Sequence, residues 1–233
     1  MSVIGSSFGV VGESVDDLVD NNQQLAEMLA TLAPGGSLTD TFFTFTLSLI
    51  GVAVSGFVVQ ATLRMRHEEA TGRLEPILST ATTRWRWMAS HLVIAMGGSL
   101  VLLTVVGASV GVAYVGATGA EVSEVFRIIG GALVHTPAAL VLGGLVTVVF
   151  AFAPRWASAI GWTSVGFAFV VGQLGTGLGL PETVIDLSPF THVPAVPAAE
   201  FELLPIVVLT SLAVGLHAVG VLGFRRRDLA VTA

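Results

Sequence analysis

Cysteine and lysine are both absent from this chain of 233 residues, and charged residues make up only 11% of it. Without cysteine, neither disulfide bonds nor thiolate metal sites can form. Without lysine, the chain cannot contain a standard Walker A loop, whose lysine reaches the nucleotide phosphates. Soluble domains carry roughly 25% charged residues. The composition therefore indicates a membrane protein that does not itself hydrolyse ATP through a Walker A site.

Long apolar runs take up much of the chain, since 53% of its residues are hydrophobic and 27 are glycine. A transmembrane helix needs about 20 predominantly apolar residues, and small residues let such helices approach closely. The runs that are long enough predict five transmembrane helices, at residues 41–62, 91–115, 129–151, 157–179 and 204–224. The predicted fold class is all-α, a polytopic membrane helix bundle whose transmembrane domain covers residues 41–233.

Residues 1–40 precede the first predicted span and contain no apolar run long enough to cross a membrane. Within residues 11–32, apolar side chains recur at roughly helical spacing with acidic residues between them, which is typical of an amphipathic helix at a membrane surface. No signal peptide or earlier span would carry this segment across the membrane. We therefore expect an upstream helix to be missing and the chain to be a fragment or half of a longer protein.

Arginine is distributed unevenly among the connections between the predicted spans. Nine of the ten arginines lie in residues 63–90, 152–156 and 225–233, whereas Arg127 lies among the acidic connections. Because cytoplasmic loops carry an excess of basic residues, this distribution predicts an N-terminus outside the cell and a C-terminus in the cytoplasm. It also makes 63–90 a cytoplasmic segment and 180–203 an external loop.

The cytoplasmic segment, residues 63–90, has the pattern of a short helix lying across the membrane surface. Gly72 is expected to end the helix that leaves the first span, and Pro76 suits the first turn of a new one. Glu69 and Arg73 would pair across one turn if the first helix continued through Gly72. A transverse helix of this kind can contact a soluble partner. The pattern alone supports equally well a loop that is only anchored at the surface.

Two sets of side chains are predicted to mark the membrane. Arginine and tryptophan next to span ends act as anchors at headgroup level, and they are Arg84, Trp85, Arg86, Trp87, Arg155, Trp156, Arg225, Arg226 and Arg227. Polar residues inside spans are costly in hydrocarbon, and they are Gln60, His135, Gln173 and His217. The polar residues either line a substrate pathway or form hydrogen bonds between helices, and we favour hydrogen bonding. Glycine pairs such as Gly107 and Gly111 predict close helix packing.

The external loop, residues 180–203, contains four prolines that exclude a regular helix. Exposed backbone cannot lie in lipid, so the loop forms an external cap or a re-entrant element. Its central residues are Ser188, Pro189, Phe190, His192 and Pro194. Ser188 and His192 are residue types found in hydrolases, but no GxSxG motif or clearly placed acid accompanies them. A structural turn is the better interpretation.

Several separated segments of the chain resemble one family of transport proteins. They are GVVGESVDDLVDNN at 9–22, EEATGRLEPILSTATTRWRW at 68–87, APRWASAIGW at 153–162, DLSPFTHVPAVP at 186–197 and FRRRDL at 224–229. These segments resemble type-2 ATP-binding-cassette exporter permeases, in particular the actinobacterial group described as polyketide-antibiotic exporters. The resemblance corresponds to the C-terminal half of such permeases, a six-helix unit that here lacks its first span.

This resemblance implies a permease subunit or half-subunit of an ATP-driven exporter in the bacterial cell membrane. By alternating access, it would move a lipophilic or amphipathic compound, such as an antibiotic or drug, out of the cell. ATP and magnesium would be bound by partner ATPase subunits rather than by this chain, and a second permease half or copy would complete the pathway. The positions that match the family's coupling helix are Glu68, Glu69, Gly72, Arg73, Leu74, Glu75, Pro76, Ile77 and Leu78.

Two other functions remain open from the sequence. The chain could be a scaffold or regulatory half-permease that transports nothing, and substrate-stimulated ATPase activity would distinguish an exporter from it. An ion-coupled transporter would need paired ionisable residues at mid-span, whereas the sequence offers isolated histidines. The sequence contains no zinc, calcium or dinucleotide motif. Its arginines are too few and too close to the membrane for nucleic-acid recognition.

Overall fold

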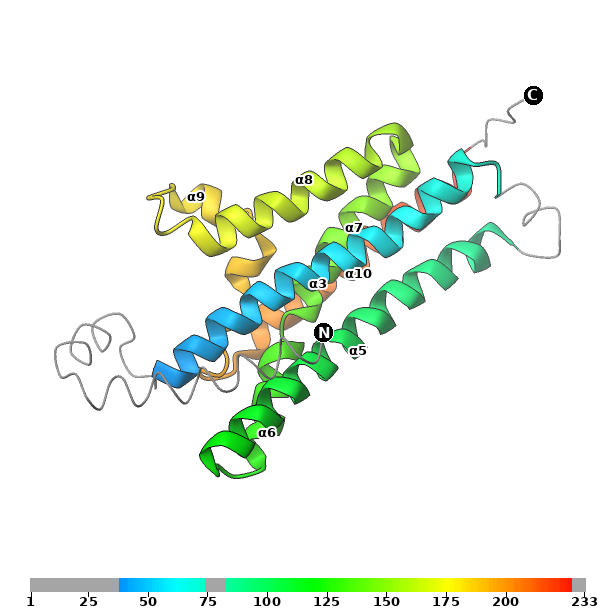
Figure 1. Ribbon diagram of the computed structural model, residues 1–233. Helices are drawn as coiled ribbons and strands as arrows, with labels where there is room; N and C mark the ends of the chain where they lie inside the picture. Colours follow the sequence, from blue (N-terminus) through cyan, green and yellow to red (C-terminus); the bar gives the residue numbers. More distant parts are fainter. Residues whose placement is uncertain (1–37, 74–82, 228–233) are drawn as a thin grey trace.

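The computed structural model describes residues 38–73 and 83–227, and the regular elements within those ranges are all helices (Figure 1). Among the described residues, five helical segments are long and apolar enough to cross a membrane. Their helices are α3 (Leu38–Ala70), α5 (Arg84–Thr118), α6 with α7 (Ser123–Leu133 and Thr136–Phe152), α8 (Ala157–Phe169) and α10 (Leu203–Arg226). This confirms the predicted all-α bundle of five spans. The amphipathic segment expected at residues 11–32 lies outside the described residues.

The third span differs from the single helix predicted at residues 129–151. It is divided into α6 and α7 by the non-helical residues Val134 and His135. Pro137 lies in the first turn of α7, and a proline cannot donate the hydrogen bond that would continue a helix from the preceding turn. The local sequence around Pro137 therefore ends one helix and begins another.

The fourth span leaves regular helical geometry earlier than predicted. After α8, residues Val170–Leu174 form one turn of π-helix, and the chain then turns through a glycine-rich stretch. Gly179 in this stretch has a backbone φ of +64°, which only glycine adopts without strain. Glycine also has a low helix propensity. These residues favour a turn over the continued helix that their hydropathy predicted.

Helix α7 lies at the centre of the bundle and packs against α3, α8 and α10. Within its span, 67% of the most apolar window is buried, compared with 22% for the spans of α8 and of α10. Small residues make this packing possible. A Cβ atom at Gly144 of α7 would lie 2.8 Å from Leu216 Cβ of α10. The hydropathy pattern did not distinguish this interior helix from the peripheral ones.

Helix α6 packs against the second half of α5, and two glycines on α5 allow the contact. A Cβ atom at Gly107 would lie 2.9 Å from Ile129 Cα, and one at Gly111 would lie 2.8 Å from Val125 Cα. Because each clash would be with backbone, no change of side-chain rotamer could relieve it. The structure thus confirms the close packing predicted from the spacing of Gly107 and Gly111.

Candidate coupling site and intramembrane polar residues

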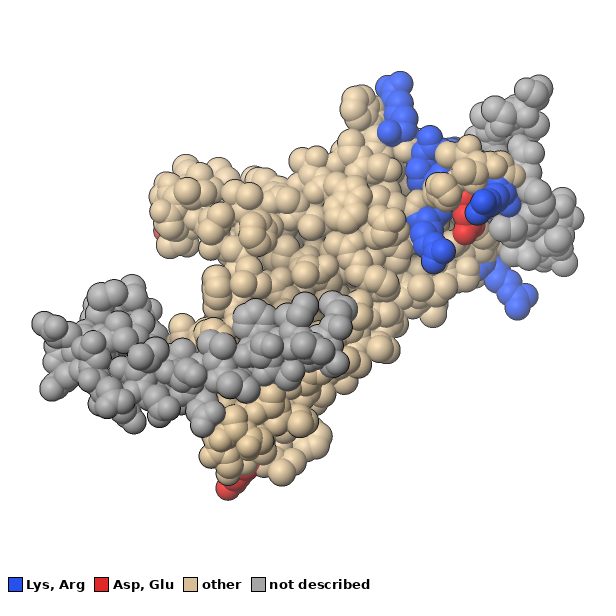
Figure 2. All heavy atoms as spheres, viewed as in Figure 1, with Lys and Arg blue, Asp and Glu red and all other residues tan. Residues whose placement is uncertain are grey.

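The described arginine side chains other than Arg127 gather at one end of the bundle, where α3 and α10 end and α5 begins (Figures 1 and 2). Helix α3 ends at Ala70, and Gly72 follows with a φ of +70°. The N–H of Gly72 donates to the Glu69 carbonyl at 3.2 Å, and the N–H of Arg73 donates to the Glu68 carbonyl at 3.0 Å. These two bonds form a Schellman motif, which satisfies the last carbonyls of the helix. Gly72 therefore ends the helix, as predicted.

The segment of residues 63–90, predicted to be cytoplasmic, returns to the bundle at the first turn of α5. Thr83 is the N-cap, and its hydroxyl oxygen accepts a hydrogen bond from the Arg86 N–H at 3.3 Å. The predicted coupling residues between the two helix ends lie outside the described residues, and they are Leu74, Glu75, Pro76, Ile77 and Leu78. The structure therefore describes the two ends of this segment, up to Arg73 and from Thr83 onwards.

Glu68, on the last turn of α3, points towards α5. Its Oε2 accepts a hydrogen bond from Trp87 Nε1 at 2.8 Å and lies 3.3 Å from His91 Nε2. The Trp87 side chain is only 4% exposed, and its ring lies 5.7 Å from that of Phe224 on α10. A buried indole N–H needs an acceptor, and Glu68 supplies it.

Glu69 forms an ion pair with Arg227, which follows α10 directly. The Arg227 guanidinium also donates to the Phe150 carbonyl at 3.0 Å and lies over the rings of Phe150 and Phe224 at 5.6 and 5.8 Å. Arg84 donates to the Arg227 carbonyl at 2.8 Å. Helices α3, α5, α7 and α10 are thus joined at one point. We call Glu68, Glu69, Arg84, Trp87, Phe150 and Arg227 the coupling cluster.

The pairing of Glu69 differs from the one predicted within the segment. Glu69 and Arg73 could face each other only on a continuous helix, and α3 has already ended at Ala70. Glu69 turns instead to Arg227, and Arg73 is exposed. Of the positions predicted to contact a partner, Gly72 and Arg73 are therefore accessible, whereas the two glutamates bind residues of this chain.

Replacing Trp87 with phenylalanine tests the contact to Glu68. The ring would still fill its site, but Glu68 would lose a charge-assisted hydrogen bond, which is worth about 1.5–3 kcal/mol. We expect a lower thermal unfolding temperature in detergent. Trp85→Phe is the matched control, because Trp85 is 56% exposed and should leave the unfolding temperature unchanged. Equal unfolding temperatures for both variants would contradict the role of Glu68.

The predicted membrane anchors divide into two groups. Trp85 and Trp156 are more than half exposed, and the Arg155 guanidinium lies 5.8 Å from the centre of the Trp156 ring. The exposed arginines of this set are Arg86, Arg155, Arg225 and Arg226. Arg84, Trp87 and Arg227 differ from the expectation, because all three bind within the coupling cluster. Tryptophan beside a span end is typical of headgroup contact, but the sequence cannot show which ring faces a neighbouring helix.

The two intramembrane histidines bond to backbone of the preceding turn. His135 Nδ1 donates to the Gly131 carbonyl at 3.0 Å, and His217 Nδ1 donates to the Ala213 carbonyl at 2.8 Å. His135 is buried against Gly51 of α3, where a Cβ atom would lie 2.7 Å from the histidine Cβ. Each bond therefore lies within its own span, and neither bond joins two spans.

The two intramembrane glutamines lie on different parts of the bundle. Gln173 donates to the Ser48 hydroxyl at 2.7 Å and so joins the end of the fourth span to α3. Gln60 is exposed and lines a groove between α3 and α8 together with Trp162. Gln173 thus makes the interhelical bond that we favoured, whereas Gln60 remains open to a ligand.

Ser188 and His192 belong to a short turn in the loop at residues 180–203. Ser188 is fully buried, and its hydroxyl oxygen accepts from the Phe190 N–H at 3.4 Å. His192 is exposed, and its Nε2 donates to the Asp186 carbonyl at 2.9 Å. Each side chain therefore holds the backbone of the turn. This geometry supports the structural interpretation over a hydrolase site.

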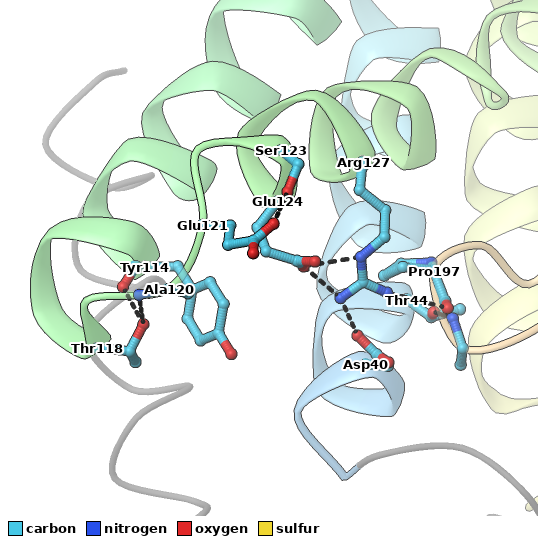
Figure 3. A network of polar contacts seen from close by, with 11 residues as sticks. Asp40, Thr44, Tyr114, Thr118, Ala120, Glu121, Ser123, Glu124, Arg127 and Pro197 are labelled. Atoms are coloured by element: carbon cyan, nitrogen blue, oxygen red, sulfur yellow. Dashed lines mark hydrogen bonds and ion pairs between the residues drawn. The ribbon is translucent and has the colours of Figure 1, made fainter.

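Arg127 forms a second polar network at the opposite end of α3 (Figure 3). Its guanidinium lies 2.6 Å from Asp40 of α3 and donates to Glu124 of α6 at 2.8 Å. A longer bond of 3.4 Å reaches the Pro197 carbonyl in the loop at residues 180–203. In the sequence, Arg127 stands out as one arginine among acidic connections. The sequence pattern could not show which of the acidic residues would pair with it. The bonds of Arg127 therefore join α3, α6 and this loop.

Comparison with known proteins gives a family match along almost the entire chain. Residues 1–225 match the family described as "Multidrug efflux system permease Rv1217c, C-terminal domain". The chain is also 30% identical over 229 residues to the multidrug efflux system permease protein Rv1217c of Mycobacterium tuberculosis. That alignment covers 98% of this chain and 42% of the relative. These matches confirm the predicted resemblance to the C-terminal half of an exporter permease.

Proposed function

This chain belongs to the family of multidrug efflux system permease C-terminal domains, and we propose that it is the membrane half-subunit of an ATP-driven exporter. In this proposal, its arginine-rich end faces the cytoplasm, following the excess of basic residues there. Partner ATPase subunits bind residues of the segment that leaves α3, and a second permease half or copy completes the pathway. The exported compound is lipophilic or amphipathic.

The observation that carries this proposal is the coupling cluster. An ATPase that pushes on the segment after Ala70 would act first on Glu68 and Glu69. Because Glu68 bonds to Trp87 of α5 and Glu69 pairs with Arg227 beyond α10, a displacement of α3 would be passed to those helices. A rigid group of helices with two arrangements is what alternating access requires.

The groove between α3 and α8 is the substrate pathway in this proposal. It has a volume of about 750 Å³ and is lined mainly by apolar side chains, with Gln60 as its polar group. Ligand sites commonly combine apolar walls with a few polar groups that orient the ligand. Since the groove lies on the outside of this chain, a second permease half placed against α3 and α8 would enclose it.

A pull-down from detergent tests the ATPase contact. Replacing residues 71–78 with a glycine–serine linker of equal length leaves Glu68 and Glu69 in place. We expect the variant to keep its unfolding temperature but to lose most of the ATPase captured by the parent chain. Arg155→Glu is the control, because it changes charge at the same end of the bundle outside this segment.

The outcomes of this pull-down separate the alternatives. Undiminished capture by the linker variant would contradict the coupling role of residues 71–78. If the parent chain itself captured no ATPase, the scaffold interpretation would replace the exporter. If the parent chain does capture an ATPase, substrate-stimulated ATP hydrolysis by that complex would distinguish an exporter from a scaffold.

A further inference from the structure

A second groove lies between α5, α7 and α10, apart from the α3–α8 groove. Its volume is about 1020 Å³, at the upper end of the usual range for ligand pockets. Apolar side chains form most of its walls, among them Met96 of α5, Leu140 of α7 and Val214 of α10. Met96 and Val214 are exposed on the bundle surface, so the groove opens sideways towards the lipid.

Two arginines stand at one end of this groove, Arg84 from the start of α5 and Arg225 from the last turn of α10. Arg84 gives one hydrogen bond to the Arg227 carbonyl, and a guanidinium has five N–H groups to donate. No salt bridge among the described residues joins either side chain to a carboxylate. The end of the groove therefore carries positive charge without a counter-charge in the described part of the chain.

The length of the groove matches the thickness of one bilayer leaflet with its headgroups. On α10 the lining runs from Arg225 to Thr210, and 15 residues of helix extend about 22 Å. One leaflet with its headgroup region is about 20–22 Å thick, which is half of the 40–45 Å of the whole bilayer. Trp85 also lines the arginine end and is largely exposed, as is typical of residues at headgroup level. A phospholipid with its headgroup at the arginines would thus extend along the groove to about the middle of the bilayer.

We propose that this groove binds an anionic phospholipid, with its phosphate between Arg84 and Arg225 and an acyl chain along α10. Basic pockets between transmembrane helices are suited to anionic headgroups. A neutral occupant would leave Arg84 and Arg225 without a counter-charge from the described part of the chain, and an apolar helix from a partner would do the same. With the orientation proposed above, the lipid belongs to the cytoplasmic leaflet. The site holds a lipid whether or not the chain transports a substrate.

Native mass spectrometry of the 233-residue chain, with phosphatidylglycerol and phosphatidylcholine titrated separately, tests this site. We expect phosphatidylglycerol to bind more tightly and Arg84→Gln/Arg225→Gln to weaken it about thirtyfold, from the attraction of two surface arginines for anionic lipid. Arg155→Gln removes an arginine of the same end that does not line the groove, and it should leave the affinity unchanged.

A steric variant tests the acyl-chain position separately from charge. Val214→Trp would fill the groove and should reduce phosphatidylglycerol binding, whereas Val207→Trp, at another exposed position of α10, should not. Equal affinity for the two lipids would overturn the proposal, as would equal losses in the Arg84/Arg225 and Arg155 variants. A non-lipid compound or a second copy of the chain found in the groove in place of lipid would overturn it as well.

Discussion

Replacing Gly220 with leucine is expected to prevent the helix bundle from assembling. A Cβ atom at this position of α10 would lie 2.7 Å from Thr147 Cγ2, 2.8 Å from the Thr147 carbonyl carbon and 2.9 Å from its oxygen. Two of these three atoms belong to the backbone of α7, so trimming the threonine would not remove the clash. The leucine would therefore force α10 away from the central helix of the bundle.

The expected cost is large, because overpacking by smaller additions already costs about 1–3 kcal/mol. Size-exclusion chromatography in detergent would measure it, and we expect little or no monodisperse protein. Gly215→Leu is the matched control on the same helix, since Gly215 is exposed and no atom lies within 4 Å of its Cβ position. Gly220→Ala should fall between the two. A Gly220→Leu protein with normal yield and unfolding temperature would show that α7 and α10 do not pack as described.

Reversing the charge of Arg227 is expected to destabilise the arginine-rich end of the bundle. Arg227→Glu would place a carboxylate beside Glu69 and remove the bonds to Phe150. The paired side chains are 21% and 16% exposed, so the expected loss lies between the near-zero value of surface pairs and the 3–5 kcal/mol of buried ones. We estimate about 2–3 kcal/mol, and an unfolding temperature lowered by about 5–10 °C in detergent.

A charge swap provides the critical control for this pair. The double variant Glu69→Arg/Arg227→Glu restores opposite charges and should recover part of the lost stability. Full recovery is not expected, because a glutamate cannot stack on Phe150 and Phe224 as the guanidinium does. Arg226→Glu, which changes an exposed neighbour, should have little effect. If all three variants unfolded at the same temperature, the pair would contribute nothing to the cluster.

These two predictions concern different requirements of the proposed alternating-access mechanism. Gly220 lets α10 pack closely against α7, and the proposed movement of the helices as one group requires such packing. Arg227 joins the end of α10, which we propose to be cytoplasmic, to the last turn of α3, where the proposed coupling segment begins. A variant that folds normally but loses the Glu69–Arg227 pair would thus separate transmission of motion from assembly of the bundle.

Local sequence also accounts for some of the fold beyond the spans themselves. Gly72 and its φ of +70° end α3 where the break was predicted, because a glycine adopts that backbone conformation without strain. Pro137, beside His135, marks the division of the third span that average hydropathy concealed. The glycines after α8 likewise explain why that span stops short of residue 179. Each of these features depends on neighbouring residues along the chain.

The candidate site was only partly predictable, because its contacts join residues that are far apart along the chain. The sequence marked Glu68, Glu69, Trp87 and Arg227 as charged or amphipathic residues near span ends, but assigned them to two different roles. Glu69 and Arg227 are 158 positions apart, and no periodic pattern relates them. The isolation of Arg127 was likewise visible, whereas its contact with Asp40 follows from the way α6 lies beside α3.

By itself, the amino-acid sequence determined that this chain is an all-α membrane protein with five spans and a break at Gly72. Those properties follow from the transfer of each segment into lipid and from the conformational preferences of single residues. Only the tertiary structure decided that α7 is the central helix and that the two glutamates of α3 bind α5 and Arg227. Burial and ion pairing depend on where helices cross, and the crossing is set by how all their side chains pack together.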